Sequence, residues 1–367
     1  MEWMTRLWNT VDGFRYRPLR RITLPGTHDA GCYVDHVYGN VFSRTQTQDI
    51  AGQLDGGIRY FDLRPYQSGG PAAYSFWIYH GPFYTGGRLD GEGGILRQTA
   101  DFIDQLGAEG RELVILNFSH FSRFSEADHQ ALIREIEDTL GERLIPRRQS
   151  GNGGIDLFEA PLVELLTDPD DGQAGPRVAI LYDGALDTPV ERYIQDHVDD
   201  LPAGFFVLSP KYAPGRNPIY LFDQYANRAL VSRMQEDQLR KLRERELYPL
   251  PFAQDGRDWP ANVPGGVAST LHLFSWTLTP QPLNPVFAAR TLSNPQLPNV
   301  FSAAAGGWRG VGGHYDPAHD PQINILYVDD YASQPYDNPA GSPYDGVALP
   351  VAIAERLNVG APWPPTW

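Results

Sequence analysis

The chain has 367 residues, of which 41% are hydrophobic and 12% aromatic, and this is enough to bury a sizeable core and to exclude disorder of the whole chain. Its formal net charge of −15 argues against a nucleic-acid-binding surface and against electrostatic adsorption to anionic membranes. The single cysteine, Cys32, excludes an intrachain disulfide and fits a reducing compartment. No segment approaches the roughly 20 consecutive apolar residues of a spanning helix, and the amino terminus lacks a signal-peptide pattern. We therefore expect a cytoplasmic protein, or one secreted by a signal-peptide-independent route.

The predicted elements begin with a lead-in helix, because the apolar residues from Trp3 to Val11 recur at helical spacing. Eight predicted strands follow, over residues 21–24, 58–63, 74–79, 112–118, 177–182, 205–209, 271–277 and 323–328. Helical patterns lie between several of them, over residues 95–106, 127–140, 190–198 and 232–247. The last of these is highly charged, which predicts a solvated outer helix.

Strands that alternate with helices are typical of parallel βαβ units, and eight of them indicate a closed barrel. The predicted fold is α/β: a single distorted (β/α)8 TIM-like barrel with long loops and a short N-terminal helix. No linker is visible, so residues 1–367 are expected to form one domain, with a lead-in over residues 1–20 and a loop-rich tail over residues 334–367. The glycine-rich segment 306–313 is also predicted to be a loop, since it lacks the context of a phosphate cradle.

Side chains with acid, base or cationic chemistry stand at the ends of four predicted strands: His28 and Asp29, Asp62 and Arg64, His80, and Asp329 and Asp330. Because the carboxyl ends of parallel strands meet at one mouth of a barrel, we expect these side chains to converge. Two imidazoles and a guanidinium are sufficient to cleave a phosphodiester without a metal. One imidazole removes a proton from the attacking hydroxyl, the other protonates the leaving oxygen, and the guanidinium holds the phosphoryl oxygens.

Three segments that carry these residues, 24–31, 57–64 and 79–82, resemble the phosphatidylinositol-specific phospholipase C family, X-type catalytic domain. The resemblance is closest to the bacterial metal-independent branch, and it implies a distorted barrel. It further implies that His28 is the general base with Asp329 as its partner, that Arg64 holds the phosphate, and that His80 is the general acid, tuned by Asp29. The implied reaction is attack of the inositol 2-hydroxyl on its own phosphodiester, with release of diacylglycerol and a cyclic inositol phosphate.

The resemblance also predicts substrate contacts, at Asp62, Ser119, Asp183 and Asp196. The family has a lysine near the position of Ser119 and an arginine near that of Asp183, and Val198 stands where the family has an aromatic residue. We therefore expect the same chemistry on an altered head group: phosphatidylinositol, a modified inositol, or another hydroxyl-bearing phosphodiester.

No cofactor and no metal ion is expected. In the calcium-requiring branch of the family a carboxylate stands at the position of Arg64, an asparagine at that of Asp29 and an acidic ligand at that of Ser119. A guanidinium cannot ligate calcium, which needs oxygen donors, but it supplies positive charge to phosphate oxygens.

The expected partner is a phospholipid or another phosphodiester substrate, with transient contact to a membrane surface and no nucleic acid. Apolar residues after the first strand form either a membrane-facing rim or a buried face: Tyr33, Val34, Val37, Tyr38, Val41 and Phe42. Tyr84 is a second rim candidate.

Two other functions stay open at this point. A glycerophosphodiester phosphodiesterase-like enzyme is also a barrel with histidines, but it relies on a metal held by carboxylates, which Arg64 disfavours. A catalytically inactive barrel that binds phosphoinositides or a protein is disfavoured by the two histidines, because binding alone does not require an acid–base pair. Chelation of metal ions and substitution of each histidine distinguish the three.

Overall fold

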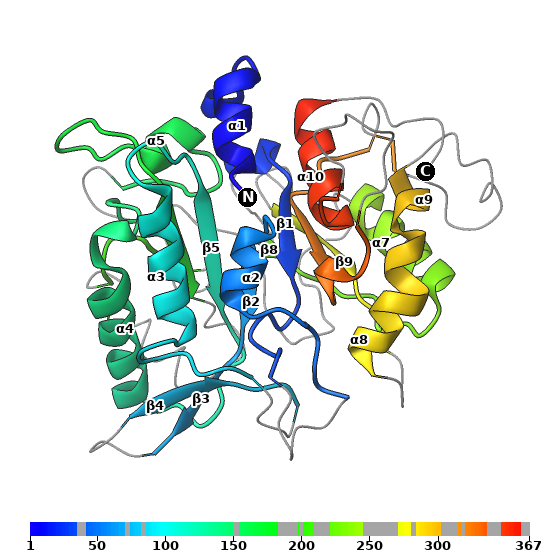
Figure 1. Cartoon of the computed structure of the whole chain (residues 1–367), viewed down its shortest axis with the longest axis horizontal. Helices are drawn as coiled ribbons and strands as arrows, with labels where there is room; N and C mark the ends of the chain where they lie inside the picture. The colour runs from blue at the N-terminus through cyan, green and yellow to red at the C-terminus, as the bar shows by residue number, and fades with distance from the viewer. Residues whose placement is uncertain are drawn as a thin grey trace.

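The computed structural model describes residues 1–34, 42–69, 74–81, 86–149, 154–182, 197, 201–207, 221–244, 271–279, 284–301, 315–316, 320–335 and 346–360. Eight parallel strands form one curled sheet in the order β7-β6-β5-β2-β1-β10-β9-β8 (Figure 1). These strands are β1 (Leu24–Thr27), β2 (Tyr60–Leu63), β5 (Leu113–Phe118), β6 (Arg177–Tyr182), β7 (Phe205–Val207), β8 (Leu221–Phe222), β9 (Leu271–Trp276) and β10 (Ile325–Val328). The predicted α/β barrel class is confirmed; within the described residues the barrel is open, with β7 and β8 as its edges.

One predicted strand is not part of the barrel. Residues 74–79 contribute β4 (Ser75–Ile78), which pairs antiparallel with β3 (Pro65–Ser68) in a separate two-stranded sheet. The eighth strand of the barrel is β8 instead. It has only two residues, and a segment of this length shows no strand pattern in the sequence. The first strand also differs from its prediction, since it begins where we expected it to end and includes Gly26. A Cβ at Gly26 would lie 2.9 Å from Ile325 Cγ2 on the next strand, so glycine permits this close pairing.

The helices are α1 (Trp3–Thr10), α2 (Ile50–Asp55), α3 (Ile95–Leu106), α4 (Glu126–Leu140), α5 (Leu162–Leu166), α7 (Val231–Glu244), α8 (Pro285–Ala288), α9 (Leu297–Phe301) and α10 (Leu349–Val359). The predicted helices over residues 3–11, 95–106 and 127–140 match α1, α3 and α4. A capping box of Ser125 and Asp128 starts α4. The prediction of loops throughout residues 334–367 is wrong for α10, which buries Val351 and Ile353. The predicted helix 190–198, apart from His197, and the predicted loop 306–313 lie outside the described residues.

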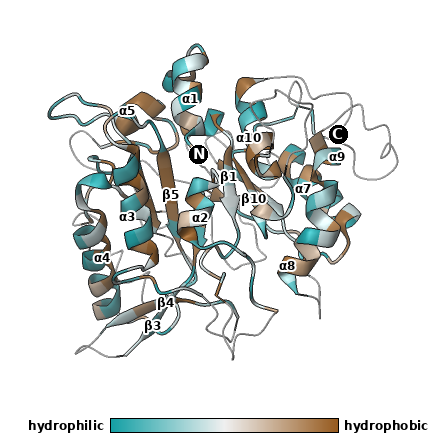
Figure 2. Ribbon diagram, in the orientation of Figure 1, coloured by the Kyte–Doolittle hydropathy of each residue, from teal (hydrophilic) through white to brown (hydrophobic). Residues whose placement is uncertain are grey.

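The core lies between the sheet and its helices. Strand β5 is buried at every position and hydrophobic along most of its length, as Figure 2 shows, and this is typical of parallel strands covered on both faces. Helix α7 is less solvated than its charge predicted, because Met234, Leu239 and Leu242 on one face are buried. No helix in the described part of the chain is long and apolar enough to cross a membrane.

The two ends of the barrel are built differently. At the amino-terminal ends of the strands α1 packs across the barrel, and the Trp3 indole donates a hydrogen bond to the Gly57 carbonyl at 2.9 Å. At the opposite end, toward which β1 and β2 point, lie the β3–β4 hairpin and α8 (Figure 1). The carboxyl ends of the strands, where barrel enzymes carry their sites, therefore share one edge with the hairpin.

Candidate active site

His28 is positioned by the pairing of β1 with β10. Its amide donates to the Val328 carbonyl at 3.0 Å, so the sheet register continues one residue beyond β1. The imidazole Nδ1 consequently lies 2.8 Å from Asp329 Oδ1. Asp330, the other carboxylate of this pair in the sequence, instead forms an ion pair with Arg290 at 3.0 Å. The structure therefore places Asp329, and not Asp330, against the histidine.

Asp29 lies at the centre of the cluster. Its backbone has a φ of +40°, in the left-handed region that aspartate tolerates better than most residues. The side chain is fully buried, and its Oδ2 lies 3.2 Å from Nε2 of both His28 and His80. Its Oδ1 lies 2.5 Å from Nε of Arg64. One carboxylate thus contacts two imidazoles and a guanidinium.

His80 comes to the cluster from the hairpin, so the prediction that it ends a third barrel strand is wrong. Strand β4 packs directly on the turn after β1, where a Cβ at Gly31 would lie only 2.6 Å from Ile78 Cγ1. Glycine at this position allows the hairpin to approach closely enough for His80 to reach Asp29. The other ring nitrogen of His80, Nδ1, lies 2.9 Å from the Ser43 carbonyl oxygen.

Arg64 and Asp62 come to the cluster from the carboxyl end of β2. Arg64 follows β2 directly, and its guanidinium lies 3.1 Å from Asp62 Oδ2. Asp62 is only 4% exposed. It accepts hydrogen bonds from the Tyr327 hydroxyl at 2.5 Å and from the Ser119 hydroxyl at 3.3 Å. Both oxygens of Asp62 are therefore already engaged by protein groups.

Burial and charge set the protonation of these groups. Burial by itself lowers the pKa of His28, but Asp29 and Asp329 outweigh it, so the pKa is raised above its ordinary value. The pKa of Asp62 is held far below its usual range, since Arg64 and His28 outweigh the effect of burial. Asp62 is thus a carboxylate over the whole physiological range, and His28 is a stronger base than a free imidazole.

Tyr327 is a site residue that our sequence reasoning missed. Burial and the neighbouring Asp62 raise the pKa of its hydroxyl well above the ordinary value, so it remains a donor. Its ring also packs edge-on against His28, with the ring centroids 5.3 Å apart. A signal was present in the sequence, because Tyr327 stands two residues before Asp329 and alternate residues of a strand share a face.

The predicted site residues fall into two groups. The structure brings seven of them together: His28, Asp29, Asp62, Arg64, His80, Ser119 and Asp329. The other two, Asp183 and Asp196, lie outside the described residues. The His28 and His80 ring centroids are 5.7 Å apart, and their side chains are 18% and 25% exposed, so the cluster is open to solvent. Two imidazoles, a carboxylate and a guanidinium at one open mouth can transfer protons around a bound anion.

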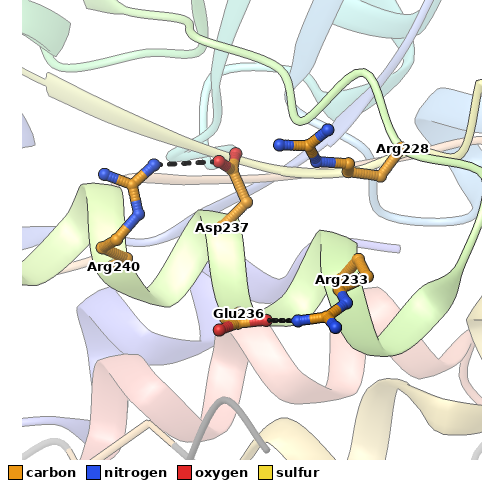
Figure 3. Close-up of a pocket in the computed structure, with 5 residues that line it drawn as sticks. All are labelled: Arg228, Arg233, Glu236, Asp237 and Arg240. Carbon is orange, nitrogen blue, oxygen red and sulfur yellow. Dashed lines mark hydrogen bonds and ion pairs between the residues drawn. The ribbon is translucent and has the colours of Figure 1, made fainter.

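A cavity of about 440 Å³ lies apart from these residues in the sequence. It is lined by residues of α7 and of the segment before it: Arg228, Arg233, Glu236, Asp237 and Arg240. Figure 3 shows the ion pairs Arg233–Glu236, at 2.8 Å, and Arg240–Asp237, at 3.1 Å. None of these described lining residues is a histidine, so they include no side chain that ordinarily exchanges protons near neutral pH.

Large apolar side chains are exposed on segments that follow the carboxyl ends of β1, β8 and β9: Phe42, Tyr225, Leu230, Phe287 and Leu292. Of the six rim candidates after the first strand, Phe42 is 49% exposed, while Tyr33 and Val34 are half-buried. Val37, Tyr38 and Val41, together with Tyr84, lie outside the described residues.

The fold and the cluster define a class of protein: an α/β barrel with two histidines, an arginine and buried carboxylates gathered at the carboxyl ends of its strands. No family model matches the chain. Over 170 residues, 40% of the chain, it is 30% identical to PI-PLC X domain-containing protein 3 of Danio rerio, of which the match covers 49%. Over 93 residues, 24% of the chain, it is 32% identical to the 1-phosphatidylinositol phosphodiesterase of Listeria monocytogenes, of which the match covers 25%. The chain thus spans about half the length, or less, of these curated relatives.

A solved structure shows the same fold over nearly the whole chain. It is a mutant of the phosphatidylinositol-specific phospholipase C from Staphylococcus aureus, which overlays on 98% of this chain and 97% of its own, with a TM-score of 0.51 and 14% identity. The predicted resemblance to the phosphatidylinositol-specific phospholipase C family is confirmed by these similarities in sequence and fold.

Proposed function

We propose that this protein is a metal-independent phospholipase C-type enzyme that cleaves phosphatidylinositol or a related hydroxyl-bearing phosphodiester. The observation that carries the proposal is the placement of His28 Nε2 and His80 Nε2, each 3.2 Å from Asp29 Oδ2, beside the Arg64 guanidinium. The names of the relatives support a phosphatidylinositol substrate. The exposed apolar side chains on segments that follow β1, β8 and β9 support contact with a lipid surface.

In the proposed reaction, His28 removes the proton from a hydroxyl next to the phosphodiester. The hydroxyl oxygen forms a bond to phosphorus while the bond to the glycerol oxygen breaks, and His80 gives that oxygen a proton. Arg64 binds the non-bridging oxygens and offsets the charge that they gain. Because the nucleophile belongs to the substrate, its effective concentration is high and no external nucleophile is needed for this step. The products are diacylglycerol and a cyclic phosphate, which water opens in a slower step.

Two carboxylates act through other residues. Asp329 holds His28 by Nδ1, which leaves Nε2 as the nitrogen that faces the substrate. Asp62 is buried and its oxygens are engaged by Arg64, Tyr327 and Ser119, so we assign it to positioning the guanidinium instead of contacting the substrate. Asp29 is shared by both histidines, and its charge favours a proton between them.

The first prediction concerns the product and the metal requirement. Vesicles of phosphatidylinositol treated with the protein in excess chelator should give the phosphorus NMR signal of a cyclic phosphate. Arg64 supports this expectation, because its guanidinium lies at the site and can supply to the phosphoryl oxygens the positive charge that calcium would otherwise supply. Loss of turnover in chelator with recovery on adding calcium would contradict metal independence. A non-cyclic phosphate as first product would instead favour the glycerophosphodiester phosphodiesterase-like alternative.

The second prediction concerns pH. The Asp329 carboxylate helps to raise the pKa of His28, so Asp329→Asn should lower that pKa. A general base must be unprotonated, and kcat/KM therefore rises with pH through the pKa of the base. The acidic limb of the kcat/KM profile should move to lower pH in the variant, and kcat should fall by about 100-fold, as expected when a general base is poorly oriented. An unchanged acidic limb would exclude His28 as the base.

A further inference from the structure

The side chains of His28, Asp29 and His80 lie close enough together to hold one metal ion. One ligand atom from each of the three lies within 4.8 Å of the others. Asp29 Oδ2 lies 3.2 Å from the Nε2 atom of each histidine. A tetrahedral zinc site with bonds of about 2.0–2.1 Å has donor atoms about 3.3 Å apart. The two distances from Asp29 Oδ2 to the histidine nitrogens therefore match the distance between neighbouring donor atoms in a tetrahedral zinc site.

Both imidazoles are oriented as metal ligands are. His28 Nδ1 lies 2.8 Å from Asp329 Oδ1, and His80 Nδ1 lies 2.9 Å from the Ser43 carbonyl oxygen. These partners only accept hydrogen bonds, so each Nδ1 carries the proton and each Nε2 of a neutral ring carries the lone pair. In metal sites, a carboxylate or carbonyl behind the ligating histidine has the same effect, and it also raises the basicity of the ligand.

The charge of the cluster favours a dication. Among the described residues of the cluster, the three carboxylates of Asp29, Asp62 and Asp329 face the guanidinium of Arg64, so their formal charge sums to −2 when both imidazoles are neutral. Asp29 is fully buried, and neither of its side-chain oxygens accepts a hydrogen bond of ordinary geometry within the described part of the chain. Its Oδ1 is taken by the ion pair with Arg64, which leaves Oδ2 directed between the two histidines.

We propose that a divalent transition metal ion, zinc above all, binds to His28 Nε2, His80 Nε2 and Asp29 Oδ2 and inhibits the enzyme. Two nitrogen donors and one carboxylate suit zinc, whereas calcium takes oxygen donors. The ion occupies both nitrogens that transfer protons, so it excludes the phosphodiester. The inhibition rests on the proposed function, but the binding does not.

Cobalt(II) tests the binding without any measurement of activity. The full chain, treated with chelator and dialysed, should take up one equivalent of Co²⁺ with the visible absorption of a four- or five-coordinate site, and Zn²⁺ should remove that absorption. His28→Ala and His80→Ala should each lose it and weaken zinc binding by at least about 100-fold, since loss of an outer-shell partner alone costs about 10–100-fold. Asp329→Asn removes the carboxylate behind His28 and should therefore weaken zinc binding by this smaller factor of about 10–100. Glu236→Gln, on the exposed face of α7 and paired with Arg233, is the control and should bind like the parent.

Zinc should also inhibit the cleavage of phosphatidylinositol in vesicles, and the inhibition should be competitive. Its inhibition constant should equal the dissociation constant of zinc that isothermal titration calorimetry gives for the protein without lipid. Absence of one-equivalent binding, or binding that both histidine variants retain, would overturn the metal site. Activation by zinc above the rate in chelator would overturn the inhibitory role. If the chain does not cleave the lipid, the proposed function fails and the cobalt spectrum still decides the site. If it cleaves the lipid but does not bind cobalt, only the metal proposal fails.

Discussion

Replacement of either histidine is expected to lower kcat for phosphodiester cleavage by about 10²–10⁴-fold, the contribution of a positioned general acid or base. His28→Ala removes the group that takes the proton from the attacking hydroxyl, and His80→Ala removes the one that protonates the leaving oxygen. Binding of phosphatidylinositol vesicles should change little, since neither substitution removes Arg64 or the exposed apolar side chains.

The choice of leaving group separates the two roles. A phenolate leaves without a proton, so an inositol phosphodiester of a nitrophenol should restore much of the activity of His80→Ala and none of that of His28→Ala. Glu236→Gln, on the exposed face of α7, is again the control and should match the parent on both substrates. Equal recovery of both variants on the nitrophenyl substrate would mean that the acid and base assignments are wrong. Unchanged activity of both variants on phosphatidylinositol would mean that the site itself is wrong.

The sequence was sufficient to predict the site because its residues follow strands that are easy to recognise. His28, Arg64 and Asp329 each come directly after a buried strand, and parallel pairing alone brings strand ends together. His80 was correctly predicted to lie beside His28 and Asp29, but it was placed there as the end of a barrel strand, which is wrong. Its strand is a nearly continuous apolar run, as expected of a barrel strand, yet β4 pairs back on β3, and Ile78 packs on Gly31 in that arrangement.

The segment 57–64 shows how the direction of a strand decides the role of a residue. It carries two arginines, Arg59 and Arg64, and both are conventional candidates for a phosphate ligand. They stand at opposite ends of β2, so only Arg64 reaches the mouth. Arg59 precedes the strand and is fully buried at the other end, 2.7 Å from Glu112 Oε2. The direction of the strand, and not the residue type, separates a site residue from a structural one.

Arg59 and Glu112 lead to the second large prediction, which concerns stability. Both side chains are fully buried, and the pair connects β2, β5 and the amino terminus. Arg59 also donates to the Met1 carbonyl at 2.5 Å, and Glu112 Oε1 accepts from the Thr5 amide at 2.8 Å. Glu112→Gln keeps the shape but removes the charge, so it leaves a buried guanidinium without its counter-ion. Loss of one partner of a buried pair costs about 3–5 kcal/mol, because the remaining charge stays desolvated.

Urea unfolding followed by tryptophan fluorescence measures this cost, and Glu236→Gln provides a matched control. Glu236 pairs with Arg233 at 2.8 Å on the surface of α7, with side chains 44% and 61% exposed, where solvent screens the charges. An exposed pair of this kind contributes about 0–1 kcal/mol.

Replacing both Arg59 and Glu112 by apolar residues of similar volume should recover part of the lost free energy of unfolding, since no unpaired charge then remains. All of these variants should retain kcat while folded, because the pair lies at the end of the barrel opposite His28 and His80. A loss of unfolding free energy in Glu112→Gln no larger than in Glu236→Gln would show that water reaches Arg59 and that the buried pair adds no more to stability than an exposed one.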